Sequence, residues 1–487
     1  MSEMEATRNT KTILVAVVVV ALVAVGGYIG LGLLGNIGPT TTGTTTTTTT
    51  SSGETLTVIT RHDVSILSVY EPAFLASDFA VSHGITKILW KTPSQEFWEA
   101  LIDTGQIDVC WGGGPTLFDQ LMRDGLLSAL NSTLMQTVAA RVNNSIAGAD
   151  MKRYDSHGNL VWIAAAISSF GFTVNDAFLT DYTLPTPSTW TDLAQPIYGS
   201  LLPTIPTIAM GNAPDTTSNT RIYEIITQGL GWDAGWSTLG RMAGSSNIYS
   251  GSVETQAAAE LGQVGISMSI DFYGYLSQYK NPDCHYVVPE GQTIVNGDPI
   301  AISNITSHED LAEGFVDFVL SPYGQSLWLH PNIRRMPVLR AAFDQPLGSQ
   351  AQDLYAVFNQ TIKTVGIDFN DTLSLEINTA FIYYFESVFT DAHTELVNCW
   401  TTIVTEYYAG HLNVSQMNMF ADMMGLTVTI LDPKTSLSEK FTIDYAREIN
   451  NNMIYDTVYA GQVQDLWTIA AKNHYNDVLS QVQALLP

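Results

Sequence analysis

The chain has 487 residues, of which 45% are hydrophobic, so it folds, and its length exceeds that of one ordinary core. The chain has 20 Lys and Arg residues and 47 Asp and Glu residues, so its formal net charge is −27 at pH 7. This charge makes nucleic acids and anionic lipid surfaces poor partners. The cysteines Cys110, Cys284 and Cys399 permit at most one disulfide and are too scattered to indicate a zinc site.

The N-terminal segment has the pattern of a membrane anchor. Residues 13–34 form one apolar run without a charged side chain. At about 1.5 Å per residue, a helix of this length spans the roughly 30 Å hydrocarbon core of a bilayer. Arg8 and Lys11 precede the run, so the positive-inside bias places residues 1–12 in the cytoplasm and the bulk of the chain outside the cell. A cleaved signal peptide is the alternative, although its apolar region would be shorter, about 7 to 15 residues.

Residues 35–53 are rich in threonine and predict a solvated, O-glycosylated stalk, because they offer hydroxyl groups and no apolar surface. As a flexible chain the stalk spans about 25 Å. Sequons for N-glycosylation also suit an exported glycoprotein, and they begin at Asn131, Asn143, Asn304, Asn359, Asn370 and Asn413.

Short apolar runs alternate with amphipathic stretches in the next part of the chain. A strand–helix rhythm of this kind predicts a parallel sheet with helices on its faces. The ligand crevice of such a sheet lies beyond the carboxyl ends of the strands. Strands are expected at residues 55–60, 85–90 and 107–111, and helices at 94–105, with Ser94 as N-cap, and 116–125.

A second α/β unit follows. Strands are expected at residues 161–167, 171–175, 206–211, 265–270 and 298–302. Helices are expected at residues 189–198, capped by Ser188, and at 219–229, 234–242, 253–261, 271–279 and 308–321, the last capped from Ser307.

The chain enters this second unit near Ser169 and leaves it near Val295, which predicts two lobes joined by two hinge crossovers around a cleft. Residues 346–487 are mostly helical by periodicity, with a strand expected at 425–431. The predicted organisation is lobe 1 at residues 54–169 with 295–345, lobe 2 at residues 170–294, and a helical C-terminal region at residues 346–487.

Several stretches resemble the extracellular solute-binding proteins of ABC importers, and in particular the group that serves ferric iron, thiamine and phosphonates. They are IDVCWGGGPTLFDQLMRDGLL, GFTVNDAFL, LPTPSTWTDLA, QGLGWDAGWSTL, GISMSIDFYGYLSQ and FVDFVLSPYGQSLW, in that order within residues 54–345. The resemblance implies a bilobal α/β fold of the type II periplasmic-binding-protein kind. It also implies a receptor without enzymatic activity or cofactor, which closes over a small molecule or ion and delivers it to an ABC permease in the same membrane.

Such receptors bind their ligands on loops after strands and at helix N-termini, where backbone N–H groups and the helix dipole favour anions. Hydroxyl groups there donate and accept, and a carboxylate with phenols binds cations or amines. The candidate ligand-binding residues chosen by this rule are Arg61, His62, Gly113, Gly114, Ser168, Ser169, Thr216, Ser218, Asp271, Tyr273 and Tyr275.

Each candidate also has a structural interpretation. Arg61 could pair with Asp63 while His62 caps a helix, and the glycines after residue 111 could form a simple turn. Residues 215–219 could serve only as an N-cap, and Tyr275 could pack within its helix.

The ligand stays open between ferric iron and an organic anion. Iron receptors of this group use two adjacent tyrosines, whereas Tyr273 and Tyr275 are separated by a glycine and point about 200° apart at a helix start. His62 and Asp271 could complete a different set of metal ligands. A phosphonate-like anion held by Arg61, hydroxyl groups and helix ends fits at least as well.

Two other classes of protein are considered. A hydrolase is not expected, because the chain has no H-E-x-x-H, G-x-S-x-G or G-K-[ST] motif. A structural or adhesive surface glycoprotein would account for the anchor, the stalk and the sequons. It would not account for two α/β units with polar loops at the strand ends.

Overall fold

A single long strand joins the two halves of the structure. This strand, β7 (Leu160–Asn175), has 16 residues, all of them buried. The computed structural model describes residues 53–486. The predicted cytoplasmic N-terminus, the anchor and the stalk up to residue 52 therefore lie outside the described residues. Within residues 53–486, no helix combines the length and the apolar character that crossing a membrane requires.

The strands form a mixed sheet in the order β2-β1-β3-β12-β7-β10-β8-β9, with β6, β11 and β13 also paired to β7. Their bounds are β1 (Glu54–Thr60), β2 (Ile85–Lys91), β3 (Val109–Trp111), β6 (Lys152–Tyr154), β8 (Ile208–Gly211), β9 (Ser246–Tyr249), β10 (Ile266–Ile270), β11 (Cys284–Val287), β12 (Val295–Ile302) and β13 (Met336–Pro337). The strands β1, β2 and β3 are parallel, as are β8, β9 and β10, while β7 and β12 run antiparallel to each other in the middle. Short hairpins are formed by β4 (Ser145–Ile146) with β5 (Ala149–Asp150), and by β14 (Thr429–Leu431) with β15 (Ser438–Lys440).

The side chains of β7 pack into the cores of two lobes. Residues up to Ile167 belong to two clusters of what we call the first lobe, the smaller of which holds Val161 and Trp162, and residues from Phe170 belong to the core of the second lobe. Ser168 and Ser169 separate them, and Ser169 pairs with Val295 at the start of β12. The sheet therefore passes from one lobe to the other at this pair of serines.

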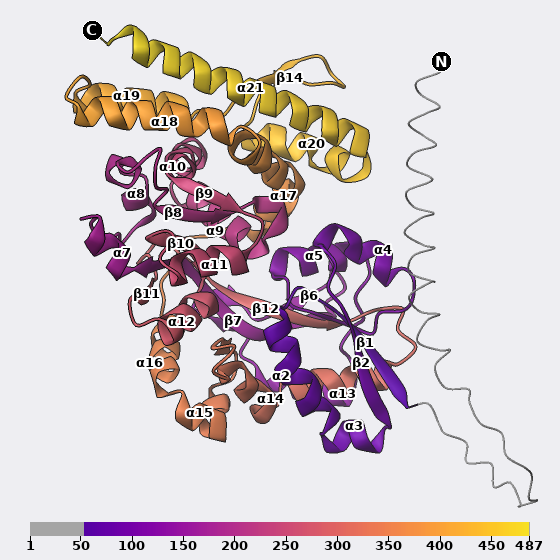
Figure 1. The fold of residues 1–487 in the computed structure, drawn as a ribbon. Helices are drawn as coiled ribbons and strands as arrows, with labels where there is room; N and C mark the ends of the chain where they lie inside the picture. Colours follow the sequence, from indigo (N-terminus) through magenta and orange to yellow (C-terminus); the bar gives the residue numbers. More distant parts are fainter. Residues whose placement is uncertain (1–52, 487) are drawn as a thin grey trace, which may run out of the picture. The chain divides into compact units, whose positions relative to one another are not determined.

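Helices surround both cores (Figure 1). In the first lobe they are α2 (Val64–Leu75), α3 (Asp78–Ser82), α4 (Trp98–Ile102), α5 (Pro115–Arg123), α6 (Thr133–Arg141), α13 (Glu309–Val319), α14 (Pro322–Ser326), α15 (Pro346–Gln350) and α16 (Gln352–Thr361). In the second lobe they are α7 (Asp176–Asp181), α8 (Trp190–Leu193), α9 (Thr217–Gly229), α10 (Trp232–Gly244), α11 (Ser252–Glu260) and α12 (Asp271–Lys280).

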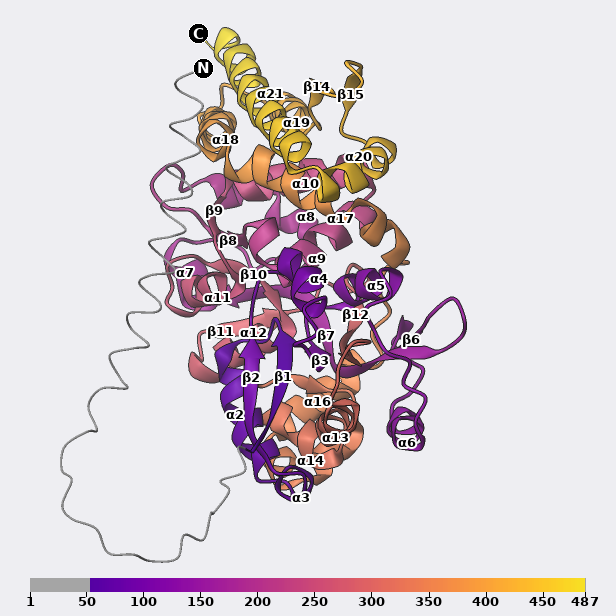
Figure 2. The same cartoon turned by 90° about the vertical axis from the view of Figure 1, so that its right-hand side faces the viewer.

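A C-terminal extension continues the second lobe. Its helices are α17 (Asp371–Phe385), α18 (His393–Tyr408), α19 (Val414–Met424), α20 (Ile443–Tyr455) and α21 (Thr457–Ala484). They share one core with residues of the second lobe and cover its outer end (Figures 1 and 2). Trp400 of α18 shows how close this packing is, because its Nε1 donates to Ser245 Oγ at 2.8 Å.

The C-terminal region thus divides between the lobes. Leu354 and Phe358 of α16 pack in the first core, whereas Ile377 of α17 packs in the second. Between them, the amide of Ile367 donates to the carbonyl oxygen of Thr293 at 3.0 Å, beside the start of β12. Within the described residues, a third segment therefore runs between the lobes alongside the two sheet crossovers.

Several local predictions differ from the structure. Residues 161–167 and 171–175 are one strand, because both halves of the sheet continue through Ser168 and Ser169 and nothing there breaks the pairing. The N-cap of α8 is Thr189, since Asp192 reaches back to it in a capping box, and Ser188 only donates to that carboxylate. His308 takes the N-cap position of α13 in place of Ser307, and Ser94 makes no capping hydrogen bond.

We predict that packing of the extension is sensitive to one glycine of α10. A Cβ at Gly244 would lie 2.8 Å from Cβ and ring atoms of the buried Trp400, so Gly244→Ala should lower the free energy of unfolding by about 1–3 kcal/mol. Gly240→Ala, one turn earlier, is the matched control, because its Cβ would meet its nearest atom at 3.5 Å. Alanine should be neutral or slightly stabilising there. Urea unfolding followed by circular dichroism measures the free energy of unfolding of both variants. Equal changes in the two variants would contradict the predicted packing.

Candidate functional site

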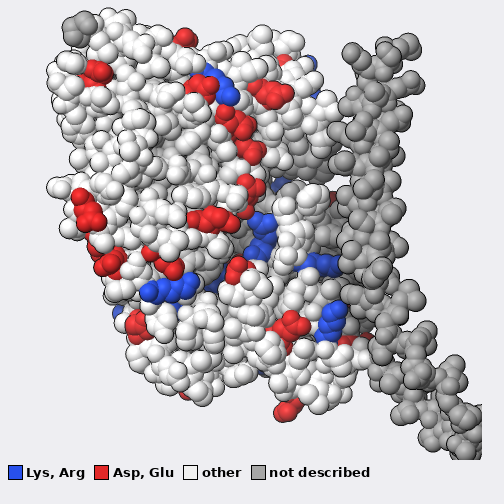
Figure 3. Space-filling view, in the orientation of Figure 1, with Lys and Arg blue, Asp and Glu red and all other residues white. Residues whose placement is uncertain are grey.

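A cavity of about 860 Å³ lies between the lobes, at the ends of strands from both. This volume falls within the roughly 300–1,000 Å³ typical of small-molecule sites. Figure 3 shows a hollow in the surface with basic side chains at its margin. Of the predicted ligand-binding residues, those that line the cavity are Arg61, His62, Gly113, Gly114, Ser168, Thr216, Ser218 and Tyr273.

The other three predicted residues lie behind the cavity wall. Asp271 is fully buried, and its Oδ2 accepts from the backbone amide of Ser169 at 2.8 Å and from its hydroxyl at 3.4 Å. Tyr275 packs edge-on against Tyr286, whose hydroxyl donates to the carbonyl oxygen of Ser169. Asp271 and Tyr275 thus hold the crossover of β7 in place and do not reach the cavity.

A buried ionic cluster forms the floor of the cavity. Arg335 Nη2 lies 3.0 Å from Asp298 Oδ2 and donates to Ser168 Oγ at 3.2 Å. His62 Nε2 lies 3.5 Å from the same carboxylate oxygen. Burial lowers the pKa of His62 to about 3, so the imidazole is neutral and the charge of Arg335 is balanced by Asp298 alone.

The floor cluster touches both lobes. Arg335 belongs to the first lobe, yet its guanidinium lies 4.8 Å from the ring centre of Phe272 at the start of α12 in the second lobe. A cation over an aromatic face is attracted by the ring quadrupole. Sequence analysis missed Arg335 and Asp298. The doublet Arg334 and Arg335 between apolar residues was a usable signal, because the chain has few basic residues.

Carboxylates occupy three of the helix N-termini near the cavity. Asp63 caps α2 by accepting from the amide of Ser65 at 2.8 Å. Asp298 Oδ1 accepts from the amides of Gly113 and Gly114 at 3.2 Å each, at the start of α5. Asp271 accepts from the amide of Phe272 at the start of α12. Because each carboxylate already takes the position that an anionic ligand would need, these helix ends are poor anion sites.

Hydroxyl groups gather at the N-termini of α9 and α11, although the first turn of α11 also carries the carboxylate of Glu254. Ser252 Oγ lies 2.5 Å from Thr216 Oγ1 and 2.7 Å from Ser218 Oγ, and we call these three residues the hydroxyl triad. The N-cap of α11 is Gly251, which has no side chain to satisfy the first amides of the helix. Hydroxyl donors and free helix amides at two converging helix ends form a favourable environment for an oxyanion.

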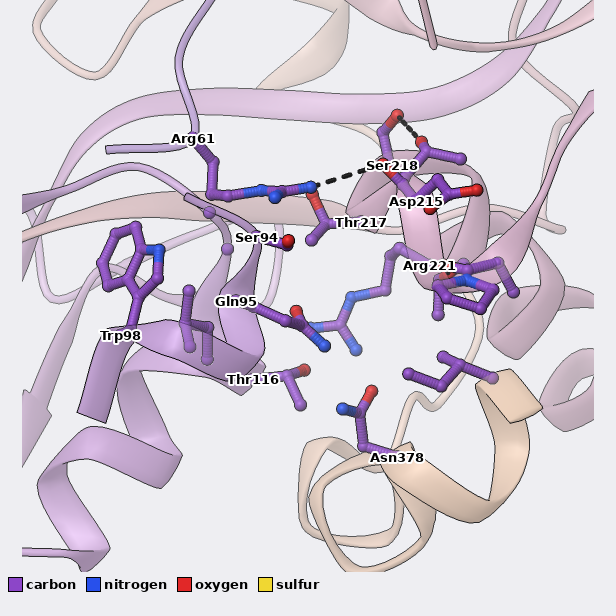
Figure 4. A pocket seen from close by; sticks show the side chains of 18 of the residues that line it. Arg61, Ser94, Gln95, Trp98, Thr116, Asp215, Thr217, Ser218, Arg221 and Asn378 are labelled. Atoms are coloured by element: carbon purple, nitrogen blue, oxygen red, sulfur yellow. Dashed lines mark hydrogen bonds between the residues drawn. The ribbon is translucent and has the colours of Figure 1, made fainter. Parts of the chain in front are cut away.

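Arg61 extends toward the hydroxyl triad from the first lobe (Figure 4). Its Nη2 donates to the carbonyl oxygen of Asp215 at 3.3 Å, and its Nη1 donates to that of Pro93 at 3.3 Å. The carboxylate of Asp215 itself accepts from Asn212 Nδ2 at 2.8 Å. The guanidinium therefore bridges the cleft and brings a positive charge to the triad.

The structure offers little to a metal ion at this site. Among residues 53–486, no three His, Cys, Asp or Glu side chains are grouped closely enough to hold one. Tyr273 lines the cavity and Tyr275 does not, so the two phenols do not converge. Burial also raises the pKa of both phenols well above the usual value, which disfavours the phenolate that binds ferric iron.

Comparisons with known proteins point to one family. Residues 107–363 match the model of a family described as bacterial extracellular solute-binding protein. Over 265 residues the chain is 27% identical to the phosphoglycerate transport regulatory protein PgtC of Salmonella typhimurium. The aligned residues make up 53% of this chain and 61% of PgtC. The chain thus matches about three fifths of the length of the curated relatives.

Solved structures share the fold. The periplasmic binding protein P5PA matches with a TM-score of 0.53 at 18% identity. The match covers 67% of this chain and 97% of the P5PA chain. The periplasmic binding protein AfuA of Actinobacillus pleuropneumoniae, solved with fructose-6-phosphate bound, matches with a TM-score of 0.50 at 18% identity, covering 63% of this chain and 98% of its own. These likenesses support the predicted α/β fold of the periplasmic-binding-protein kind.

The buried carboxyl group of Asp271 predicts a pH dependence of stability. Burial raises its pKa from 3.8 to about 7 in the folded protein. Between about pH 4 and pH 7 the folded state therefore binds a proton that the unfolded state has lost, and stability falls as the pH rises through this window. Relative to Asp271→Asn, the wild type should lose on the order of 3 kcal/mol from pH 4.5 to pH 8.

Urea unfolding of both proteins at pH 4.5, 6 and 8 measures this difference. The neutral His62 contributes the opposite slope, since its folded pKa is lowered to about 3, but it is present in both proteins and cancels. Parallel stability curves for the two proteins would show that Asp271 is ionised in the fold throughout.

Proposed function

Because the chain belongs to the family of bacterial extracellular solute-binding proteins, we propose that it is the receptor of an ABC importer for a phosphorylated organic anion. The observation that carries this proposal is the hydroxyl triad of Thr216, Ser218 and Ser252, beside which Arg61 reaches the carbonyl oxygen of Asp215 from the other lobe. The triad and the ends of α9 and α11 bind the phosphate group, and Arg61 neutralises part of its charge.

The chemistry of this site suits a phosphate group in particular. A phosphate has several acceptor oxygens, and hydroxyl groups, helix amides and a guanidinium supply donors from different directions. The names of two of the proteins compared with this chain mention phosphorylated compounds. PgtC is named for phosphoglycerate transport, and the AfuA structure contains bound fructose-6-phosphate. Ferric iron is the less suitable ligand, because the two tyrosines do not converge.

Ligand binding stabilises a closed form of the receptor. Arg61 belongs to the first lobe and the triad to the second, so one phosphate group contacted by both holds the lobes together. The crossovers at Ser169 and Val295 supply the hinge, with the segment near Ile367 running beside them. The permease recognises the closed form and receives the solute from it.

The N-terminal segment keeps the receptor beside its permease. Residues 13–34 cross the membrane and the threonine-rich stalk gives the lobes about 25 Å of reach, which maintains a high effective concentration at the transporter. Exposed sequons, such as the one at Asn143, carry glycans on the outer surface. An adhesive role would use the same anchor and stalk, but it does not account for a cavity with converging polar groups.

Removing two hydroxyl groups of the triad should weaken phosphate binding. Hydrogen bonds to a charged group contribute about 1.5–3 kcal/mol each, so Ser218→Ala combined with Ser252→Ala should raise the Kd for 3-phosphoglycerate and for inorganic phosphate at least tenfold. The matched control is Ser480→Ala, an exposed serine of α21 far from the triad in sequence. Isothermal titration calorimetry measures both Kd values. A wild-type protein that binds neither compound would refute the proposed ligand class.

Closure should be visible as a change in size. Saturation with 3-phosphoglycerate should lower the radius of gyration measured by small-angle X-ray scattering. Arg61→Gln, which removes the charge that reaches across the cleft, should require a higher ligand concentration for the same change. An unchanged radius at saturation would rule out the closing mechanism.

A further inference from the structure

The cavity continues from the hydroxyl triad to the C-terminal extension. Asn378 and Ile382 of α17 and Gln464 of α21 line the same cavity of about 860 Å³ as Arg61 and Ser218. These extension residues lie beyond residue 363, where the match to the solute-binding family ends. This end of the cavity is therefore built by a part of the chain that the family match does not include.

Polar side chains from three elements face each other at this end. Gln95 and Thr116 come from the first lobe, Gln95 from the 3-10 turn before α4 and Thr116 from the start of α5, and Asn378 comes from α17. Figure 4 shows Arg221 of α9 extending between them. Among the described residues, the side chains of Gln95, Thr116 and Asn378 form no hydrogen bond. Amide and hydroxyl groups both donate and accept, so these three residues offer a neutral, two-way hydrogen-bonding surface.

Arg221 and Glu224 add a buried ion pair, and Asp371 adds a second carboxylate to it. Arg221 is 5% exposed and Glu224 is 3% exposed. Arg221 Nη1 lies 3.1 Å from Glu224 Oε2, and its Nη2 lies 2.9 Å from Asp371 Oδ1. With two carboxylates against one guanidinium, this place repels a second anionic group. Glu224 is one of the residues that line the cavity, and its buried Oε1 has no hydrogen-bond partner among the described residues, so an acceptor is left close to the cavity.

From these contacts we infer that the C-terminal extension completes a second subsite, which binds the hydroxyl-bearing carbon chain of a sugar phosphate. The inference rests on the proposed function, in which the triad and Arg61 bind the phosphate. The sugar hydroxyls donate to Glu224 Oε1 and exchange hydrogen bonds with Gln95, Thr116 and Asn378. A cavity of about 860 Å³ has room for a ligand larger than a three-carbon acid.

The subsite also depends on the position of the lobes. The Arg221–Asp371 ion pair ties α17 to the second lobe, while α17 also contacts α5 of the first lobe, as both ribbon views show. Gln95 and Thr116 therefore face Asn378 only when the lobes are as close as they are here. A ligand that spans both subsites has two independent contacts that favour closure.

Asn378→Leu tests the inference, since leucine keeps the size of the side chain and removes its hydrogen bonds. The probes are fructose-6-phosphate and inorganic phosphate, titrated into the full chain by isothermal titration calorimetry. The wild type should bind fructose-6-phosphate at least tenfold more tightly than inorganic phosphate. Asn378→Leu should weaken fructose-6-phosphate binding about three- to tenfold and leave the Kd for inorganic phosphate within twofold. Asn451→Leu, at an exposed position of α20 outside the cavity, should change neither value.

Each contrary outcome is distinguishable. If Asn378→Leu and the wild type bind fructose-6-phosphate equally, or if the sugar phosphate binds no more tightly than inorganic phosphate, the second subsite is refuted while the phosphate site stands. If Asn378→Leu raises the Kd values for both probes by the same factor, Asn378 stabilises the arrangement of the lobes and does not contact a sugar. If the wild type binds neither probe, the proposed phosphate function fails and the subsite fails with it. Matching melting temperatures establish that the variants are folded.

Discussion

The pairing of Asp298 with Arg335 is the constraint on which the cleft depends. One oxygen of the carboxylate faces the guanidinium at 3.0 Å and the other accepts from the amides of Gly113 and Gly114, so a single side chain on β12 fixes both the cavity floor and the start of α5. Removing one partner of a buried ion pair typically costs about 3–5 kcal/mol, because the other charge is left without compensation. The same arginine lies against Phe272, so the second lobe is aligned on this pair as well.

The pattern of carboxylates explains how so acidic a protein can hold an anion. Its net charge is −27, yet three of the acids that line the cavity, Asp63, Glu224 and Asp298, are already engaged as a helix cap or as ion-pair partners. Asp63, Asp271 and Asp298 neutralise the ends of α2, α12 and α5, whereas α9 is capped by the neutral hydroxyl of Thr216 and α11 begins at Gly251 with Glu254 in its first turn. Charges farther away are screened within a Debye length of about 8 Å at physiological salt, so the nearby donors of the triad and Arg61 dominate.

The sequence predicted what depends on local patterns. Strand and helix positions follow from periodicity and capping. Arg61 was found because it follows a strand directly, and Thr216 and Ser218 because they stand at the start of a helix. Asp298 was missed because its role comes from pairing with amides 184 and 185 residues away in the chain. Asp271 also follows a strand, as a ligand residue would, but it is buried at the first position of its helix and holds Ser169, and sequence position alone does not separate these roles.

The extension changes what the cleft can select. A cleft bounded only by the two lobes would select chiefly by charge, because its strongest contacts are to the phosphate. Asn378 adds a neutral contact whose strength depends on where the ligand places its hydroxyl groups, and Glu224 adds an acceptor that is left unpaired when a hydroxyl is missing. A site built to hydrogen-bond a hydroxyl rejects an analogue that lacks it far more strongly than an apolar pocket rejects a missing methylene. In the receptor that we propose, the extension therefore turns a general anion site into one that distinguishes between phosphate esters.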